Sequence, residues 1–150
     1  MPQIEASVVI ARKPEEVFEY LADVQNLPVW DVSVVKAEQV GSGLTGLGTR
    51  FRGVNKVMGK TFDWTTEVTE FESPRRITFT AVEGRMKFTV TDVLEPVEGG
   101  TKFTYRIDAE SGLGGVFGRL ADPLIVKSQT RTVRANLDTL ADLLAEESNH

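Results

Sequence analysis

The sequence predicts an α+β fold: a curved antiparallel sheet of about seven strands, two short N-terminal helices and one long C-terminal helix enclosing an apolar cavity. One observation is the order of the segments, because a short helical pattern precedes a series of period-two runs and a helical run closes the chain. Another is that the large aromatics fall on one phase of the period-two runs: Phe51, Phe62, Trp64, Phe79, Phe88, Phe103 and Tyr105. One helix covering a sheet lined with rings leaves either a solid core or an apolar cavity.

Composition excludes several classes of function. The chain has 150 residues, which fits one domain over 1–150, and a domain of that length buries ~70% of its unfolded surface without needing a disulfide or metal. It has no cysteine, and its only histidine is the terminal His150. Disulfides, thiol nucleophiles, histidine triads and cysteine or histidine metal clusters are therefore excluded. We expect no metal and no organic cofactor.

Charge and hydropathy limit the partners. The formal net charge is −5 and the calculated pI is about 5.0, so no basic stripe favours nucleic acid or an anionic membrane. The opening residues M-P-Q-I-E-A lack the pattern of a signal peptide, and no apolar run approaches the ~20 residues of a membrane span. We expect a cytoplasmic protein, either a monomer or a homodimer, without a membrane span or a nucleic-acid partner.

The N-terminal part is expected to hold one strand and two short helices. Residues 4–10 alternate between apolar and other side chains, which predicts a half-buried strand. A helix is expected from Pro14, which suits a first helical turn, and Glu15 and Glu16 place negative charge at its positive end. A second short helical turn is expected within 23–30.

The next strand is ambiguous in its inward phase. Residues 31–40 have the composition of a strand, but Val34 competes with Val35 and Ala37 for the inward face. The glycine-rich segment 41–48 follows. It lacks the lysine and the spacing of a phosphate-binding loop, so we expect a flexible surface loop.

The remaining period-two runs favour an antiparallel meander. They are separated by short turns with no helix between them, and they cover residues 49–58, 61–71, 77–81, 86–91 and 103–108. After 111–115 the period changes to 3.6, which predicts the closing helix. Pro123 predicts a kink that separates the stripe Phe117, Leu120, Leu124 from its continuation Val126, Val133, Leu137, Leu140, Leu144.

Several local motifs carry a family resemblance. They are V-V-I-A-R-K-P-E-E-V-F-E-Y-L-A-D and N-L-P-V-W at the front, F-E-S-P-R-R-I-T-F in the middle, and L-E-P-V-E-G-G-T-K-F-T-Y and A-N-L-D-T-L further on. With them the chain resembles the helix-grip superfamily, also called START-like or SRPBCC, and most of all its polyketide cyclase/dehydrase-type branch. The resemblance covers nearly the whole chain and implies a sheet that grips the C-terminal helix around a deep apolar pocket.

The resemblance also implies a range of functions. Members bind lipids, sterols, polyketides or plant hormones, and some catalyse cyclisation or dehydration. The superfamily has no shared catalytic motif to carry over, and proteins of one fold can differ completely in function.

We expect the ligand contacts to be mainly apolar, as small-molecule pockets are. The candidates are Trp30, Phe51, Asn55, Trp64, Phe79, Phe88, Tyr105, Phe117, Leu120 and Leu124. Alternatively, each aromatic ring is part of the ordinary core. Trp30 could instead anchor its helix to the sheet, and Asn55 could form a hydrogen-bond bridge to a neighbour.

The catalytic residues cannot be identified from a motif, and two candidates remain. Asp92 falls in phase with apolar residues, so it is either an acid or base with a raised pKa or a solvated residue near a strand end. Tyr105 offers a hydroxyl on the same face.

The long helix adds four polar candidates: Gln129, Thr130, Arg131 and Asn136. Arg131 either binds a ligand carboxylate or phosphate, or is an ordinary solvated residue.

The favoured function is binding of a hydrophobic small molecule, such as a lipid, quinone, sterol or polyketide, between the sheet and the C-terminal helix. The alternative is a polyketide cyclase or dehydratase that acts on such a ligand by general acid/base catalysis. A third hypothesis is a regulatory module gated by the loop 41–48 or by 111–115.

Overall fold

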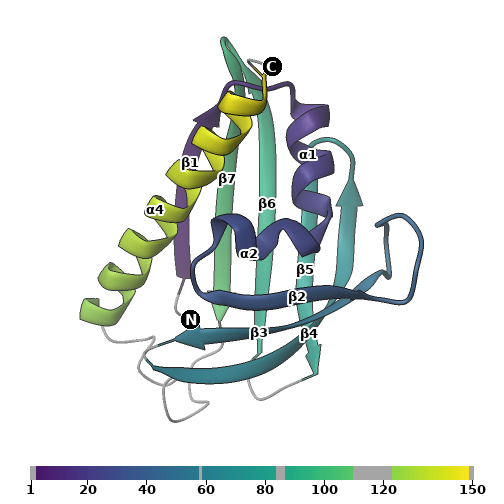
Figure 1. Ribbon diagram of the computed structural model, residues 1–150, viewed down its shortest axis with the longest axis vertical. Coiled ribbons are helices and arrows are strands. Elements are labelled where there is room, and N and C mark those ends of the chain that lie inside the picture. Colours follow the sequence, from purple (N-terminus) through teal and green to yellow (C-terminus); the bar gives the residue numbers. More distant parts are fainter. Residues whose placement is uncertain (1–2, 58, 84–86, 110–122, 149–150) are drawn as a thin grey trace.

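The computed structural model describes residues 3–57, 59–83, 87–109 and 123–148 (Figure 1). Within these residues the strands are β1 (Gln3–Ile10), β2 (Val34–Val40), β3 (Arg50–Val57), β4 (Lys60–Glu72), β5 (Arg76–Glu83), β6 (Phe88–Val97) and β7 (Gly100–Ala109). The helices are α1 (Pro14–Ala22), the short 3₁₀ turn η1 (Val24–Asn26), α2 (Leu27–Trp30) and α4 (Pro123–Ser148).

The strands form one antiparallel sheet in the order β1-β7-β6-β5-β4-β3-β2. From β2 to β7 each strand pairs with the next along the chain, which confirms the predicted meander. The exception is β1, which pairs with β7, so that Ala6 lies opposite Tyr105 and Ile10 opposite Thr101. The first and the last strands of the chain are thereby neighbours, and the predicted fold class is confirmed.

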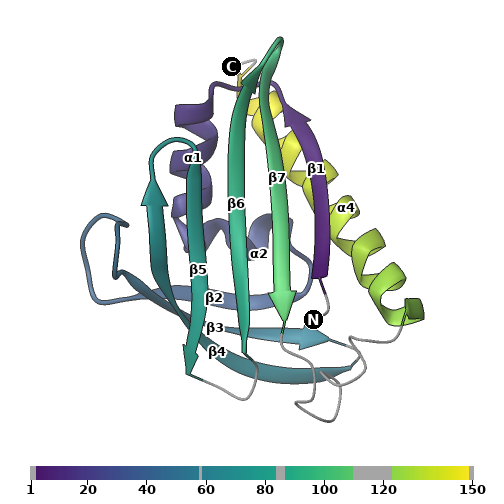
Figure 2. The same ribbon diagram turned by 180° about the vertical axis from the view of Figure 1, so that it is seen from behind.

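The sheet is strongly curled and carries its helices on one face. Strands β1, β5, β6 and β7 run along the long axis, whereas β2 and β3 cross it, and α1, α2 and α4 lie on the concave side (Figures 1 and 2). The register of β4 against β5 shifts between Thr65 and Thr66 and again between Val68 and Glu70. Such bulges bend a strand and increase its twist. The bend allows β4 to pair with β5 along the long axis and with β3 across it.

A bulge also resolves the ambiguous phase of β2. The register of β2 against β3 shifts between Val34 and Lys36. Val34 is buried and Ala37 is half-buried, although they are an odd number of residues apart, while Val35 is 57% exposed. The extra residue reverses the alternation of inward and outward side chains along β2. Val34 therefore faces inward on one side of the bulge and Ala37 on the other.

The core lies between the concave face of the sheet and the helices. The inward stripe of α4 is buried as predicted at Val133, Leu137, Leu140 and Leu144. Helix α1 buries Phe18, whose ring contacts Phe71 edge-to-face at 5.4 Å between centroids. Helix α4 therefore packs along the edge strand β1, and α1 packs against β6 and β7.

The predicted kink at Pro123 falls at the first residue of α4, where proline is well tolerated because its missing N–H has no helical partner there. Phe117 and Leu120, and the segment 111–115, lie outside the described residues. Leu124 belongs to the first turn of α4, but its side chain is also outside the described part of the chain. The interpretation of Phe117, Leu120 and Leu124 as ligand contacts therefore stays a prediction.

Candidate ligand-binding pocket

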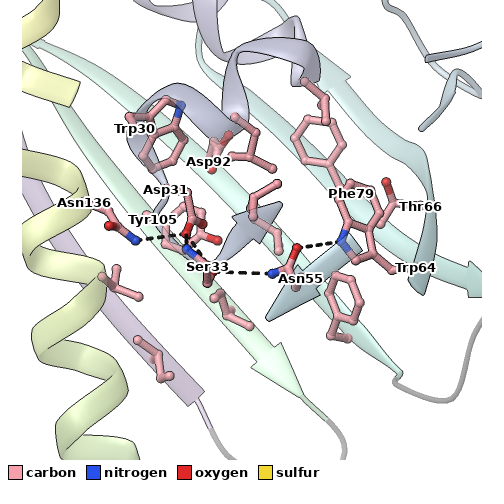
Figure 3. A pocket seen from close by; sticks show the side chains of 18 of the residues that line it. Trp30, Asp31, Ser33, Asn55, Trp64, Thr66, Phe79, Asp92, Tyr105 and Asn136 are labelled. Carbon is pink, nitrogen blue, oxygen red and sulfur yellow. Dashed lines mark hydrogen bonds between the residues drawn. The ribbon is translucent and has the colours of Figure 1, made fainter. Parts of the chain in front are cut away.

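A pocket of about 170 Å³ lies on the concave face, between the sheet, η1, α2 and α4 (Figure 3). Every described strand and helix contributes at least one side chain to it. Its apolar wall consists of Ile4, Leu21, Val24, Leu27, Trp30, Val34, Phe62, Trp64, Phe79, Phe88, Val90, Ile107, Ala109 and Val133. This wall is apolar because the inward phases of the strands meet there, above the fully buried core.

Most of the residues expected at the ligand line this pocket. They are Trp30, Asn55, Trp64, Phe79, Phe88 and Tyr105, together with the candidate acid Asp92. Phe51 is different: it is completely buried and does not line the pocket. Its ring instead contacts Phe79 edge-to-face at 6.0 Å, so Phe51 supports a wall residue from within the core.

Asp31 is the centre of a buried hydrogen-bond network at one side of the pocket (Figure 3). Its Oδ1 accepts hydrogen bonds from the Ser33 backbone N–H at 2.9 Å, the Ser33 hydroxyl at 2.7 Å and the Asn136 Nδ2 at 3.1 Å. The Asn136 Oδ1 in turn accepts from the Val32 backbone N–H at 3.3 Å. Burial raises the pKa of Asp31, opposed by its bonds to Ser33 and Asn136.

The network continues along β3 and β4. The Asn55 Nδ2 lies 3.5 Å from the Ser33 hydroxyl oxygen, and the Trp64 Nε1 donates to the Asn55 Oδ1 at 2.7 Å. Figure 3 shows these side chains in one row from α4 to β4. Asn55 is therefore held by its neighbours, as a bridge, while it also lines the pocket.

Asp92 and Tyr105 face each other across β6 and β7. They are directly opposed in the strand register, which places both side chains on the same face of the sheet. Asp92 is only 4% exposed, so the alternative of a solvated strand end is wrong. Its Oδ1 is buried and has no hydrogen-bond partner among the described residues.

Burial raises the pKa values of both Asp92 and Tyr105. Desolvation raises the pKa of Asp92 to about 8, because removal from water penalises the charged form. Desolvation also raises the pKa of Tyr105 well above its usual value, and the nearby Asp31 and Asp92 add to this shift. The phenol therefore stays protonated at neutral pH, and the carboxyl of Asp92 is largely protonated there.

The pocket has acidic but no basic residues among those described. Asp23, Asp31 and Asp92 line it, together with Gln129, Thr132 and Asn136 from α4. Arg131 is exposed and is not part of the wall. Within the described residues no group of three or more His, Cys, Asp or Glu could hold a metal ion.

The sequence pattern missed Asp31 and Ser33. The segment D-V-S contains a local signal, because an aspartate that bonds the backbone two residues later is typical of an Asx turn. That signal predicts the turn but not the ligand site. The partner from α4, Asn136, is 105 residues away in sequence, and only the fold brings it to Asp31.

The loop 41–48 is a surface loop, as predicted. Gly41, Gly43 and Gly48 have positive φ angles, and Leu44 is almost fully exposed. The Thr45 hydroxyl donates to the Ala22 carbonyl at 2.9 Å and ties the loop to the end of α1.

A curled antiparallel sheet closed by a long C-terminal helix around an apolar pocket is the helix-grip fold of the START-like (SRPBCC) superfamily. The chain belongs to the polyketide cyclase / dehydrase and lipid transport family, whose model matches residues 1–145. No curated protein matches the sequence.

Solved structures resemble this chain over nearly its whole length. The protein TTHA0849 of Thermus thermophilus is 28% identical, covers 98% of this chain and 99% of its own, and superposes with a TM-score of 0.81. A START superfamily protein of Mycobacterium smegmatis is 15% identical over 96% of this chain and 97% of its own, with a TM-score of 0.76. Ginseng (Panax ginseng) major latex-like protein 151 is 13% identical over 93% and 95%, with a TM-score of 0.70. The last two share the fold alone.

In the described part of the chain, no helix has the length and apolar character needed to cross a membrane.

Proposed function

We propose that this protein binds a hydrophobic small molecule in the pocket between the curled sheet and α4. The observation that carries the proposal is the combination of a mainly apolar wall with a row of hydrogen-bonded polar groups on one side. Small-molecule sites have this composition, because apolar surface supplies affinity and a few placed polar groups fix the orientation.

The size of the pocket supports a compact ligand. At about 170 Å³ it exceeds the ~150 Å³ of an apolar cavity that is known to bind benzene. Closure of the wall on such a ligand would contribute about 25 cal/mol for each Å² of apolar surface removed from water. We therefore expect a molecule of one or two rings, or a short chain of equivalent size.

The test is direct measurement of binding with the intrinsic tryptophans. Both tryptophans of the chain, Trp30 and Trp64, line the pocket, so their fluorescence reports occupancy without an added label. The neutral dye Nile red and native mass spectrometry after gentle purification provide two independent readings. Saturable binding at one site per chain is the expected result. A protein that is purified empty, and does not bind Nile red or any neutral apolar compound, would contradict the proposal.

A matched pair of variants localises the binding. Val90 lines the pocket, and Val90→Phe should fill it and abolish binding while the fold is retained. Val9 on β1 is 56% exposed and is not part of the wall, so Val9→Phe should bind as the wild type does. Equal binding by the two variants would place the ligand elsewhere.

A second candidate function is acid/base catalysis on such a ligand, of the cyclase or dehydratase kind. It is favoured by Asp92, a buried carboxyl without a partner that lines the pocket beside Tyr105 and has a pKa near the working range of an acid or base. With a polyketide-like substrate, turnover should fall by about 10²-fold or more in Asp92→Asn. Unchanged turnover in both Asp92→Asn and Tyr105→Phe, with the fold intact, would remove these residues as the catalysts.

A further inference from the structure

We infer that the pocket selects an uncharged apolar molecule that carries a carbonyl group, and that it rejects carboxylates such as fatty acids. The inference rests on the proposed function, because it names the class of ligand for the same pocket. It follows from three features of the pocket: an unpartnered buried acid, a phenol directly opposite it, and the absence of any basic side chain from the described wall.

Asp92 is the first hydrogen-bond donor. Its neighbours in register are Ile77 on β5 and Tyr105 on β7, so neither residue directly opposite it is a cation. Its Oδ1 has no partner in the described part of the protein. An isolated carboxylate in such a place costs far more free energy than a protonated carboxyl does. The raised pKa of Asp92 agrees with this geometry, and the protonated group has one O–H to donate.

Tyr105 is the second donor. Its ring is fixed edge-to-face against Trp30 at 6.1 Å and against Phe103 at 6.2 Å. The residue is buried and lines the pocket. Burial and the neighbouring acids keep the phenol protonated. It therefore offers a second O–H beside that of Asp92.

Two donors on directly opposed residues match a carbonyl oxygen. That oxygen has two lone pairs and no proton, so it can accept from Asp92 and Tyr105 together. A saturated hydrocarbon would leave both donors unpaired in an apolar pocket, which carries a free-energy cost. The pocket thus has a reason to prefer a ketone over an alkane of the same shape.

The surroundings in the pocket are unfavourable for a ligand that carries a carboxylate. Asp31 uses its Oδ1 to accept three hydrogen bonds, which is the pattern that an ionised carboxyl satisfies. Asp23 lies at the exposed rim of the pocket. No Lys, Arg or His is present in the described wall to pair with a ligand carboxylate. An anionic ligand would therefore be desolvated beside acids and without a counter-ion.

The test compares three ligands with the same two fused saturated rings: decalone, decalin and decalin carboxylate. Binding is measured by tryptophan fluorescence and native mass spectrometry at about pH 6.5, where Asp92 is protonated according to its raised pKa. We expect decalone to bind about tenfold or more tightly than either of the other two. Equal or tighter binding of the carboxylate would overturn the inference while supporting the proposed function. Failure of all three to bind would overturn the inference, and if Nile red also failed to bind, it would overturn the proposed function as well.

Two variants test the role of Asp92. In Asp92→Leu the preference for decalone over decalin should fall by about tenfold, because one donor is lost. In Asp92→Asn the amide N–H still donates, so the preference should be retained. An unchanged preference in Asp92→Leu would overturn the assignment of this donor.

The pH dependence of ligand preference distinguishes the protonated form of Asp92 from its ionised form. The titratable groups that line the pocket with Asp92 are Asp23, Asp31 and Tyr105. Above about pH 8 Asp92 loses its proton, and the wild type should lose its preference for decalone there, while Asp92→Asn keeps it. Because the variant retains Asp23, Asp31 and Tyr105, a parallel loss in Asp92→Asn would assign the pH effect to those groups and contradict the inference.

Discussion

The burial of Asp92 links a single residue of the pocket to the pH dependence of stability. Its phase among the apolar residues of β6 is visible in the sequence, but its degree of burial is not. Because burial favours the neutral form, the folded protein binds one more proton at this residue than the unfolded chain does between pH 3.8 and about 8. The free energy of unfolding should therefore fall as pH rises through that interval.

Replacement of Asp92 by asparagine should remove this loss of stability. Each pH unit between the two pKa values costs up to about 1.4 kcal/mol in the wild type, so Asp92→Asn should be more stable at about pH 8 and less sensitive to pH. A smaller slope of the same sign should remain, because the pKa of Asp31 is raised too. Urea unfolding at several pH values measures both slopes. Identical slopes in the variant and the wild type would contradict the raised pKa of Asp92. The control is Asp63→Asn on the exposed face of β4, which should leave the slope unchanged.

Gly53 is a second residue with a strict requirement. A Cβ atom at this position would lie 2.5 Å from the Lys36 backbone oxygen and 2.3 Å from the Trp64 ring atom Cζ2. The glycine on β3 is therefore what allows the Trp64 indole to approach the β3 backbone at this point, from where it donates to Asn55.

The substitution Gly53→Ala should destabilise the fold by about 1–3 kcal/mol, since either Trp64 or the β2 backbone must move. It should also change the tryptophan fluorescence of the native state. Gly46→Ala is the matched control, because a Cβ there meets nothing within 4 Å. If denaturant unfolding gave the same stability for both variants, the close packing at Gly53 would be disproved.

At the scale of elements, α4 is connected to the start of β2 by polar contacts as well as by its apolar stripe. Asn136 donates to Asp31 and accepts from the Val32 backbone N–H. These two bonds place the helix at the side of the pocket where the polar row begins. The stripe itself was predictable from its period of 3.6, whereas the role of Asn136 depends on a residue far away in the chain.

Removal of this connection should have a measurable cost. Asn136→Ala leaves the Val32 N–H without its partner and Asp31 with one donor fewer, and we expect a loss of about 1–3 kcal/mol in the free energy of unfolding. Thr139 is exposed on the same helix and bonds only the Ala135 carbonyl within it, so Thr139→Ala should change stability by less than about 0.5 kcal/mol. Equal effects of the two substitutions would show that the connection to β2 contributes nothing.

At the scale of the whole molecule, the pocket exists because the strongly curled sheet is wider than its helical cover. Helices α1, α2 and α4 cover parts of the concave face (Figure 1), and the inward side chains between them do not fill the remaining space. A ligand that enters this space binds the folded chain only, so it must stabilise the fold by mass action.

Thermal unfolding should show this stabilisation. At a free decalone concentration of about one hundred times its Kd, the wild type should gain about 2.7 kcal/mol, with a corresponding rise in Tm. The filled variant Val90→Phe should show no such rise, whereas Val9→Phe should match the wild type. A rise of equal size in Val90→Phe would indicate binding outside the pocket.

The sequence alone determined the order of the elements, the inward phase of most strands and the acidic, cysteine-free character of the chain, because periodicity and composition are local properties. Tertiary structure decided the rest. The bulge in β2 allowed Val34 and Ala37 both to face inward, and the curl of the sheet placed Phe51 in the core but Phe79 at the pocket. The burial of Asp92 and the meeting of Asp31 with Asn136 depend on the proximity of segments distant in sequence, and no local pattern records that proximity.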